Sequence, residues 1–285
     1  MTLFKVIGRN RRLSFPLPPF RFRKKNVGII GCGQFSFSNI LPRIYLRYGS
    51  IFRYAYDPDL LAQRSLCRMF SVSDSINSYN AIINDSSVGL VYVASPHSTH
   101  AQYAVDCLSS GKDVYVEKPI AVSLEQLSSL KNVQKSNGRK LYVGFNRPHS
   151  PFIKDIRRHY DTTSPFFCSM IVFGHKIAKD HWYRESDQGS RIAGNCSHSI
   201  DLAVHILSWR SLVWPLSVTL TQLPSEFTDE NFVLHISSPC GSLITLSFFA
   251  QHEPHLGVTE TINFHSSSLT AVINNFQSIR IDTGS

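Results

Sequence analysis

The chain has 285 residues, of which 42% are hydrophobic and 17% charged, and this composition is typical of a folded globular protein of one or two domains. It holds no apolar run near the roughly 20 residues that a membrane-spanning helix needs, so we expect a cytoplasmic protein without a membrane span. The formal net charge of +9 comes almost entirely from residues 1–25, which hold eight basic and no acidic side chains, so the body of the protein lacks the charge of a nucleic-acid-binding domain.

Residues 1–25 form a basic N-terminal arm that also contains proline and aromatic residues. The arm lacks the apolar core and the small-residue cleavage site of a secretory signal. We expect it to lie over the body of the protein or over a neighbouring subunit. Contact with an anionic lipid or another polyanionic surface is the alternative, because clustered Lys and Arg side chains attract such surfaces.

Residues 26–146 alternate apolar runs with helix-like stretches, which predicts an α/β fold with a doubly wound parallel sheet. The expected strands lie at 27–31, 52–56, 90–94, 113–116 and 141–145, and the expected helices at 35–48, 58–70, 98–110 and 123–136. Ligands of such sheets bind at the carboxyl ends of the strands, so the residues at those ends are the candidate site.

The first predicted strand runs into a glycine-rich turn, Gly31-Cys-Gly33, that is typical of dinucleotide binding. Gly31 allows the tight turn, Gly33 leaves room for a pyrophosphate, and the helix that starts at Gln34 and Phe35 offers backbone N–H groups to that anion. Ser36 stands where a third glycine is usual, which weakens the motif without breaking it.

Asp57 ends the second predicted strand, about twenty residues after the turn, where its carboxylate suits the 2′-hydroxyl of a ribose. No basic residue stands beside it in the sequence. A 2′-phosphate about 4 Å from this carboxylate would meet a repulsion of roughly 4 kcal/mol at an effective dielectric constant near 20, so we predict NAD rather than NADP as the cofactor. A glycine-rich turn that binds no ligand is the alternative.

Two further strand ends carry residues that we expect to bind the cofactor. After the strand at 90–94 these residues are Ser95, Pro96, His97 and His100, and after the strand at 113–116 they are Glu117 and Lys118. Pro119 disfavours helix at Lys118, so we expect the lysine in extended backbone, with its ammonium group in the crevice that holds the cofactor. A surface lysine without a role is the alternative.

Residues 147–285 have a different pattern. Helical stretches at 152–160 and 197–208 flank a strand at 166–174, and further strands follow at 216–222, 231–237, 242–250, 258–264 and 269–273. Consecutive strands without intervening helices predict a C-terminal α+β domain for substrate binding and dimerisation, with an open, mostly antiparallel sheet.

The six cysteines and twelve histidines show no spacing that is typical of a metal site or a disulfide framework. The cysteines contain no C-x-x-C pair, so we expect reduced thiols, as in a cytosolic protein. His97 and His100 stand three residues apart, but no cysteine or carboxylate is close enough in sequence to complete a ligand set. We therefore expect no metal.

The motifs resemble, in order and spacing, the Gfo/Idh/MocA family of glucose-fructose oxidoreductases and inositol dehydrogenases. The resemblance rests on Gly31-Cys-Gly33, on residues 95–100 (Ser-Pro-His-Ser-Thr-His), on residues 111–119, which end in Glu-Lys-Pro, and on residues 143–147. It covers about residues 26–275. It implies a Rossmann domain, a C-terminal domain with an open antiparallel sheet, and NAD(P)-dependent oxidation or reduction at a carbinol carbon of a sugar, sugar nucleotide or cyclitol.

The resemblance also implies two catalytic residues, Lys118 of the Glu-Lys-Pro motif and His198, which begins a His-x-x-Asp spacing on an apolar helix. An imidazole that titrates near neutral pH can take the hydroxyl proton as hydride leaves, and can return it in the reverse direction. The lysine would donate a hydrogen bond to the same oxygen and stabilise its developing negative charge. A histidine satisfied in the core is the alternative for His198.

One departure from the family concerns the residues before this histidine. Many relatives carry an aspartate four residues before it, and a subgroup carries a glutamate three residues before it, whereas this chain has Gly194 and Asn195. Either His198 works without a carboxylate, or another acid supplies one, or activity is impaired. The candidate acids are Glu185, Asp187 and Asp201.

The expected substrate residues are polar or aromatic side chains near these motifs, namely Asn146, Arg147, Trp182, Tyr183 and Asn195. Trp182 and Tyr183 suit the rim of a sugar site because aromatic faces pack on pyranose rings, and aromatic packing without a ligand is an equal alternative. Arg147 suits an anionic group on the substrate. Pro148 replaces a second arginine that is common in similar sequences, which argues against a strongly anionic substrate.

A second departure is the length of the chain. Similar proteins continue past the equivalent of Phe276 into a final helix, whereas this chain stops at Ser285, so we expect that helix to be lacking. A partner subunit would then cover the open sheet, in a homo-oligomer that is a dimer or a tetramer. The predicted function is an NAD(P)-dependent oxidoreductase acting on a small sugar-type substrate. A catalytically weak NAD-binding sensor or scaffold of the same fold is the alternative.

Overall fold

The structure is a computed structural model that describes residues 24–210, 214–222, 224 and 229–284. The chain forms two compact units: the first runs to Gly144 and includes Asp187–Gly189, and the second holds the other residues from Phe145 onward. Apart from Lys24 and Lys25, the basic arm lies outside the described residues, so what we expect of it stays a prediction. No helix within the described ranges is long and apolar enough to cross a bilayer.

The first unit contains a six-stranded sheet of order β3-β2-β1-β4-β5-β6 in which every pairing is parallel. Its strands are β1 (Val27–Ile30), β2 (Phe52–Tyr56), β3 (Asp74–Ser75), β4 (Leu90–Val93), β5 (Asp113–Val116) and β6 (Leu141–Val143). Its helices are the π-helix η2 (Ser36–Ile40), α2 (Leu41–Tyr48), α3 (Leu60–Phe70), α4 (Asn80–Asn84), α5 (His97–Ser109) and α6 (Leu124–Asn137). The predicted Rossmann fold is confirmed, and only the short β3 and α4 were not predicted.

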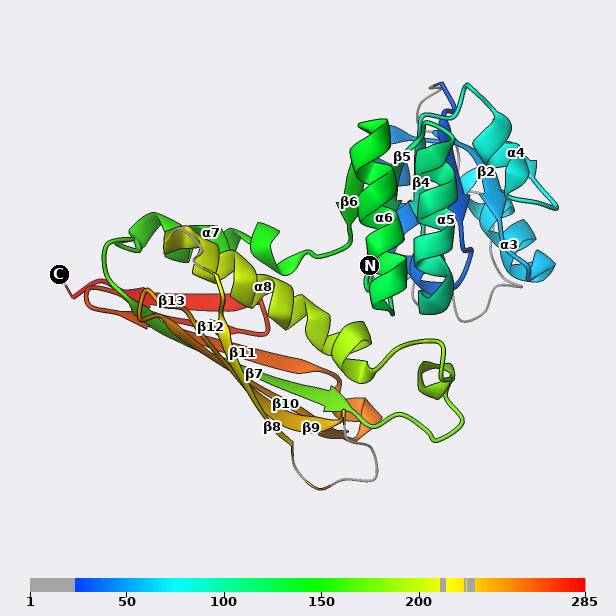
Figure 1. The fold of residues 1–285 in the computed structure, drawn as a ribbon. Coiled ribbons are helices and arrows are strands. Elements are labelled where there is room, and N and C mark those ends of the chain that lie inside the picture. Colours follow the sequence, from blue (N-terminus) through cyan, green and yellow to red (C-terminus); the bar gives the residue numbers. More distant parts are fainter. Residues whose placement is uncertain (1–23, 211–213, 223, 225–228, 285) are drawn as a thin grey trace. The chain divides into compact units, whose positions relative to one another are not determined.

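Both faces of this sheet are buried, which explains why its strands are almost continuously apolar. Ile29 and Phe52 pack on one face against α2 and α3, and Val91 and Val114 pack on the other face against α5 and α6. Figure 1 shows α5 and α6 side by side along the sheet. The carboxyl ends of the central strands are thus held by two packed layers of helices.

The second unit contains a seven-stranded sheet of order β13-β12-β11-β7-β10-β9-β8. Its strands are β7 (Phe166–His175), β8 (Ser217–Gln222), β9 (Asn231–Ser237), β10 (Leu243–His252), β11 (Thr259–Ser266), β12 (Thr270–Asn274) and β13 (Ser278–Asp282). Only β7 and β10 pair in parallel, so the predicted mostly antiparallel sheet is confirmed. The strand β13 was not predicted.

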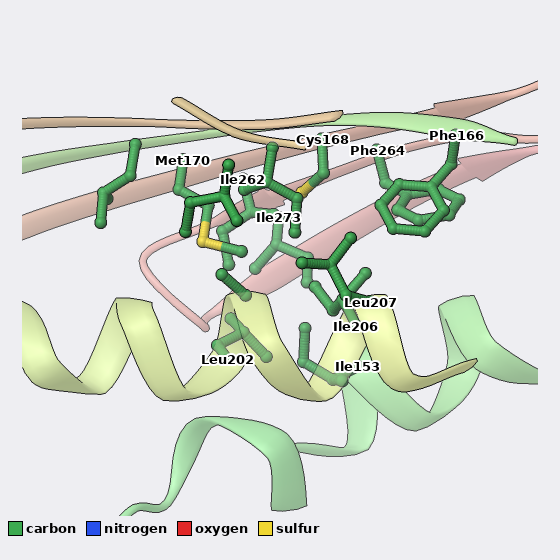
Figure 2. Packing of buried hydrophobic residues seen from close by; sticks show 14 of the residues in the cluster. Ile153, Phe166, Cys168, Met170, Leu202, Ile206, Leu207, Ile262, Phe264 and Ile273 are labelled. Carbon is green, nitrogen blue, oxygen red and sulfur yellow. The ribbon is translucent and has the colours of Figure 1, made fainter. Parts of the chain in front are cut away.

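Helices cover one face of the second sheet. They are α7 (Pro151–His159) and α8 (Ser197–Leu207), with the short helices η3 (Arg147–His149), η4 (Trp182–Arg184), η5 (Ile192–Cys196), η6 (Ser208–Arg210) and η7 (Pro254–Leu256) elsewhere in the unit. Figure 2 shows Leu202 and Ile206 of α8 directed at Met170 and Ile273 of the sheet. Alternate residues of β7 are buried against these helices, while Phe167 and Phe173 on the other face are 41% and 38% exposed.

The turn after β1 requires glycine at its first position. Gly31 has a φ of +96°, and a Cβ atom there would lie 2.4 Å from the carbonyl oxygen of Ala94, which follows β4. A Cβ atom on Gly33 would meet no atom within 4 Å. The first glycine is therefore demanded by the fold itself, whereas the second borders open space.

We predict that Gly31→Ala lowers the free energy of unfolding by about 2–4 kcal/mol, because the new methyl group collides with backbone and the left-handed φ is strained. Gly33→Ala is the matched control and should change that free energy by less than about 1 kcal/mol. Urea unfolding followed by circular dichroism measures both. Equal losses for the two variants would contradict the different roles given to the two glycines.

Candidate functional site

The glycine turn and the acid after β2 are joined by hydrogen bonds at the carboxyl edge of the first sheet. The backbone N–H of Cys32 donates to Oδ2 of Asp57 at 2.6 Å, and the N–H of Asp59 donates to Oδ1 at 2.8 Å. Each carboxylate oxygen has a second lone pair, so the carboxylate can still accept a hydrogen bond from a ribose hydroxyl. The two sequence features that predict a dinucleotide site are therefore in direct contact.

The start of the helix after the turn fits a pyrophosphate. The hydroxyl of Ser36 donates to the Gly31 carbonyl at 2.6 Å and is fully buried, so the residue in the third-glycine position braces the turn instead of obstructing it. The chain becomes helical directly after Gly33, where the N–H groups of a first helical turn face an incoming anion. Gln34 and Phe35 of this turn are exposed. The open space above Gly33 is the room that a phosphate group requires.

Two buried histidines support the loops that follow β4 and β5. His100 is 1% exposed, with Nδ1 2.8 Å from the carbonyl oxygen of Pro119 and Nε2 2.8 Å from that of Ser95. His97 is 5% exposed and its Nδ1 lies 3.2 Å from the carbonyl oxygen of Gln188. Burial lowers the pKa of both histidines, to about 4 for His97, so His97 is neutral at physiological pH. Direct contact of these histidines with a cofactor stays a prediction.

The hydroxyl of Ser95 lies 2.7 Å from that of Thr99, and Pro96 caps the start of α5. Their expected cofactor contacts therefore also remain predictions. The positions of the loop residues agree with a strand end that presents backbone to a ligand.

The Glu-Lys-Pro motif extends from the end of β5 beside these histidines. Burial raises the pKa of the Glu117 carboxyl, which accepts a hydrogen bond from the Tyr115 hydroxyl at 3.3 Å. A Cβ atom on Gly144 would lie 2.6 Å from that carboxyl group, so the carboxyl end of Glu117 lies directly over the backbone at Gly144. The positive charge of half-buried Lys118 contributes to the low pKa of both His97 and His100. This lysine is thus close to the residues expected around the cofactor.

Gln188 belongs to the first unit and was not predicted from the sequence. It is 4% exposed; its Nε2 donates to the hydroxyl of Ser98 at 2.9 Å, and its carbonyl faces His97. Asp187, a candidate acid, lies beside it and accepts from its Nε2 at 3.0 Å. A contact across 90 residues of sequence leaves no local pattern, so sequence reasoning could not find it.

In the second unit, His198 lies in the first turn of α8. It is half-buried, and its ring packs edge-on against Phe145 with 5.9 Å between centroids. Burial raises the pKa of Asp201, and the charges that act against this rise are those of His205 and His149. Asp201 is thus electrostatically coupled to those two histidines. Glu185, the remaining candidate acid, is exposed.

Arg147 is engaged within the protein. Its guanidinium forms an ion pair with Glu260 of β11 and donates from Nη1 to Oδ1 of Asn146 at 2.9 Å. The pair ties η3 to the sheet. The expected contact of Arg147 and Asn146 with substrate stays a prediction, and in this structure both side chains have structural partners.

The aromatic segment before α8 is anchored by an arginine on a buried acid. Trp182 is 40% exposed and its ring lies 4.5 Å from that of Tyr183, whose pKa is raised by burial. Arg184 donates from Nη2 to Glu230 at 2.7 Å and to the carbonyl of Ile177 at 3.1 Å. The indole therefore has both an exposed face and a fixed support.

Sequence reasoning missed Glu230 and Arg191. Glu230 is 6% exposed and precedes β9; it accepts from Arg184 and lies 3.7 Å from a guanidinium nitrogen of Arg191. Arg191 in turn donates from Nε to Oδ1 of Asn195 at 3.4 Å.

No group of three or more His, Cys, Asp and Glu side chains within the described ranges is arranged to hold a metal ion.

Comparison with known proteins identifies relatives of this chain. Residues 25–145 match the model of the oxidoreductase family with an NAD-binding Rossmann fold, Gfo/Idh/MocA. Inositol 2-dehydrogenase 2 of Saccharopolyspora erythraea is 27% identical over 184 residues, which are 64% of this chain and 53% of that protein. The 1-carboxy-3-chloro-3,4-dihydroxycyclohexa-1,5-diene dehydrogenase of Comamonas testosteroni is 30% identical over 62% of this chain and 46% of that protein. The chain thus spans about half the length of these two curated relatives.

Solved structures share the fold of nearly the whole chain. The WlbA dehydrogenase from Bordetella pertussis, in complex with NADH and UDP-GlcNAcA, superposes with a TM-score of 0.78 at 17% identity, covering 94% of this chain and 79% of that one. A dehydrogenase from Chromobacterium violaceum gives a TM-score of 0.77 at 21% identity, covering 92% of this chain and 75% of that one. The unit that holds the glycine turn and Asp57 is thus similar to the NAD-binding Rossmann domain of the Gfo/Idh/MocA oxidoreductase family over residues 25–145, and nearly the whole chain shares the fold of the two dehydrogenases above.

Proposed function

We propose that the protein is an NAD-dependent oxidoreductase that acts on a CH–OH group of a sugar, a sugar nucleotide or a cyclitol. The observation that carries the proposal is the contact between the glycine turn and Asp57, which assembles a dinucleotide site from two segments of the first unit. The names of the relatives support the substrate class, since they include an inositol dehydrogenase and a protein crystallised with a sugar nucleotide.

The first unit would hold the cofactor through four elements. The N–H groups after Gly33 would bind the pyrophosphate, and Asp57 would accept from the ribose hydroxyl groups. His100 holds the backbone at Ser95 and Pro119 in place, which fixes the two loops that border the nicotinamide half of such a site. When bound, NAD supplies a hydride acceptor, and NADH a hydride donor.

The reacting hydroxyl would be served by two side chains. We assign His198 as the general base that takes the hydroxyl proton during oxidation and returns it during reduction. Lys118 would donate a hydrogen bond to the same oxygen and stabilise its negative charge. Trp182 and Tyr183 would pack on the sugar ring, since the exposed indole face is already supported by its neighbour.

We also propose that two or four copies associate through the uncovered face of the second sheet. Phe167 and Phe173 expose large aromatic surfaces there. Large exposed apolar patches on a protein surface mark sites of interaction with another molecule.

The first prediction concerns cofactor choice. NADH should bind more tightly than NADPH, because a 2′-phosphate would be repelled by the Asp57 carboxylate. Asp57→Asn removes that charge and should narrow the preference by about tenfold or more. Fluorescence titration of both nucleotides measures it, with Asp113→Asn, at the start of β5, as a control of equal charge change. Tighter binding of NADPH to the unmodified protein would contradict the assignment.

The second prediction concerns catalysis. His198→Ala should lower turnover by about a hundredfold or more, while the affinity for NADH is unchanged, because only proton transfer is lost. His205→Ala, two turns further along α8, should leave turnover within about threefold. The readout is NADH absorbance across a panel of sugars, sugar nucleotides and cyclitols. Unchanged turnover in His198→Ala would reject the histidine, and NADH binding without turnover by the unmodified protein would favour a sensor or scaffold.

The third prediction concerns assembly. Light scattering should give two or four times the chain mass of 32.2 kDa. Phe173→Asp should reduce that mass, because a carboxylate would be buried at the interface. Leu124→Asp on α6, where Leu124 is 78% exposed in the first unit, should not. A monomer before any substitution would disprove this interface.

A further inference from the structure

A buried guanidinium group lies at the start of the helix that carries His198. Arg191 is 3% exposed, and its Nη1 and Nη2 atoms donate to the carbonyl oxygen of His175 at 3.1 and 3.2 Å. Its Nη1 also lies 3.7 Å from the carboxylate of Glu230. A Cβ atom on Gly174 would be 3.4 Å from Nη2, so the guanidinium lies close to the backbone of β7. These contacts hold the guanidinium in one orientation.

The Nε–H group of the guanidinium points at Asn195. Nε of Arg191 donates to Oδ1 of Asn195 at 3.4 Å. An amide can be turned either way in principle, but a guanidinium offers only donors, so the oxygen must face Arg191. The amide NH₂ group then points away from Arg191, and this edge of Asn195 is a hydrogen-bond donor.

Asn195 and His198 are three residues apart where η5 runs directly into α8. Side chains three residues apart are neighbours on one face of an α-helix, and here the first of the two lies in the last turn of the π-helix η5. This spacing would place a donor of fixed orientation next to the candidate catalytic histidine, where a carboxylate would be an acceptor.

We propose that Arg191 is a positioning residue that fixes the Asn195 amide as a hydrogen-bond donor beside His198, so that the substrate group recognised at position 195 is an acceptor oxygen. The inference rests on the proposed function, because the group recognised belongs to the oxidoreductase substrate. It also has a consequence for the missing acid. A carboxylate introduced at position 195 would pair with Arg191 and would not serve as a base for the reaction.

The test uses Asn195→Asp in the full chain, labelled with ¹³C at the aspartate carboxyl groups. This variant keeps every described contact of the Arg191 guanidinium with His175 and Glu230, so we expect it to fold. The pKa of the introduced carboxyl, followed by its ¹³C shift, should lie at least about one unit below the ordinary value near 3.9, because a guanidinium faces it. The control is Asn263→Asp on the sheet, where the amide donates to the Ser169 hydroxyl at 3.2 Å; its carboxyl should titrate within about half a unit of the ordinary value.

A pKa at or above the ordinary value at position 195 would overturn the proposal. A second readout uses whichever substrate of the panel is turned over. Asn195→Asp should raise KM by about tenfold and change kcat by less than about threefold, without a new fall in rate on the acid side of the pH profile, because the donor is lost while His198 and Lys118 remain. A gain in kcat with such a fall would also overturn it. Absence of NADH binding would count against the proposed function alone, since the carboxyl pKa is measured without cofactor.

Discussion

The contact on which the cofactor site depends is the hydrogen bond from the Cys32 N–H to the Asp57 carboxylate. It closes the turn after β1 against the end of β2. On the other side of β1, the backbone at Ala94 lies close to Gly31. The helices packed on both faces of the sheet hold the strand ends that make this contact, so the position of the site depends on the packing of the core. Ser36, in place of a third glycine, adds a buried hydroxyl bond to the same turn.

Two segments of the second unit that carry proposed substrate residues meet at a buried acid, Glu230. Glu230 bonds to Arg184, which supports the aromatic segment, and it lies near Arg191, which contacts Asn195 at the start of the histidine helix. Removing one partner of a buried ion pair leaves an uncompensated charge, so these segments are expected to depend on one another. The segments that carry Trp182, Tyr183 and Asn195 are thus linked through a group that no sequence motif includes.

The fold was predictable because its signals are local. The glycine turn, the apolar runs and the spacing of Asp57 indicate the parallel sheet and the dinucleotide site, and the consecutive strands after residue 216 indicate the open sheet. The two-residue β3 is too short to leave a periodic pattern, and β13 alternates polar and apolar residues in a stretch where no strand was expected. Glu230 and Gln188 were not predicted as site residues. In the sequence a buried polar residue cannot be told from a surface residue until its distant partners are known.

Arg147 shows the limit of residue-type arguments. An arginine in this turn suits an anionic substrate group, yet its guanidinium pairs with Glu260, which is 113 residues away in sequence.

The central claim is the dinucleotide site and its use in hydride transfer. A crystal structure of the protein with NADH would test it most directly: we predict the pyrophosphate on the N–H groups after Gly33, the adenosine ribose on Asp57, and nicotinamide C4 facing Lys118 and His198. A pyrophosphate bound elsewhere, or a nicotinamide ring remote from both residues, would contradict the account.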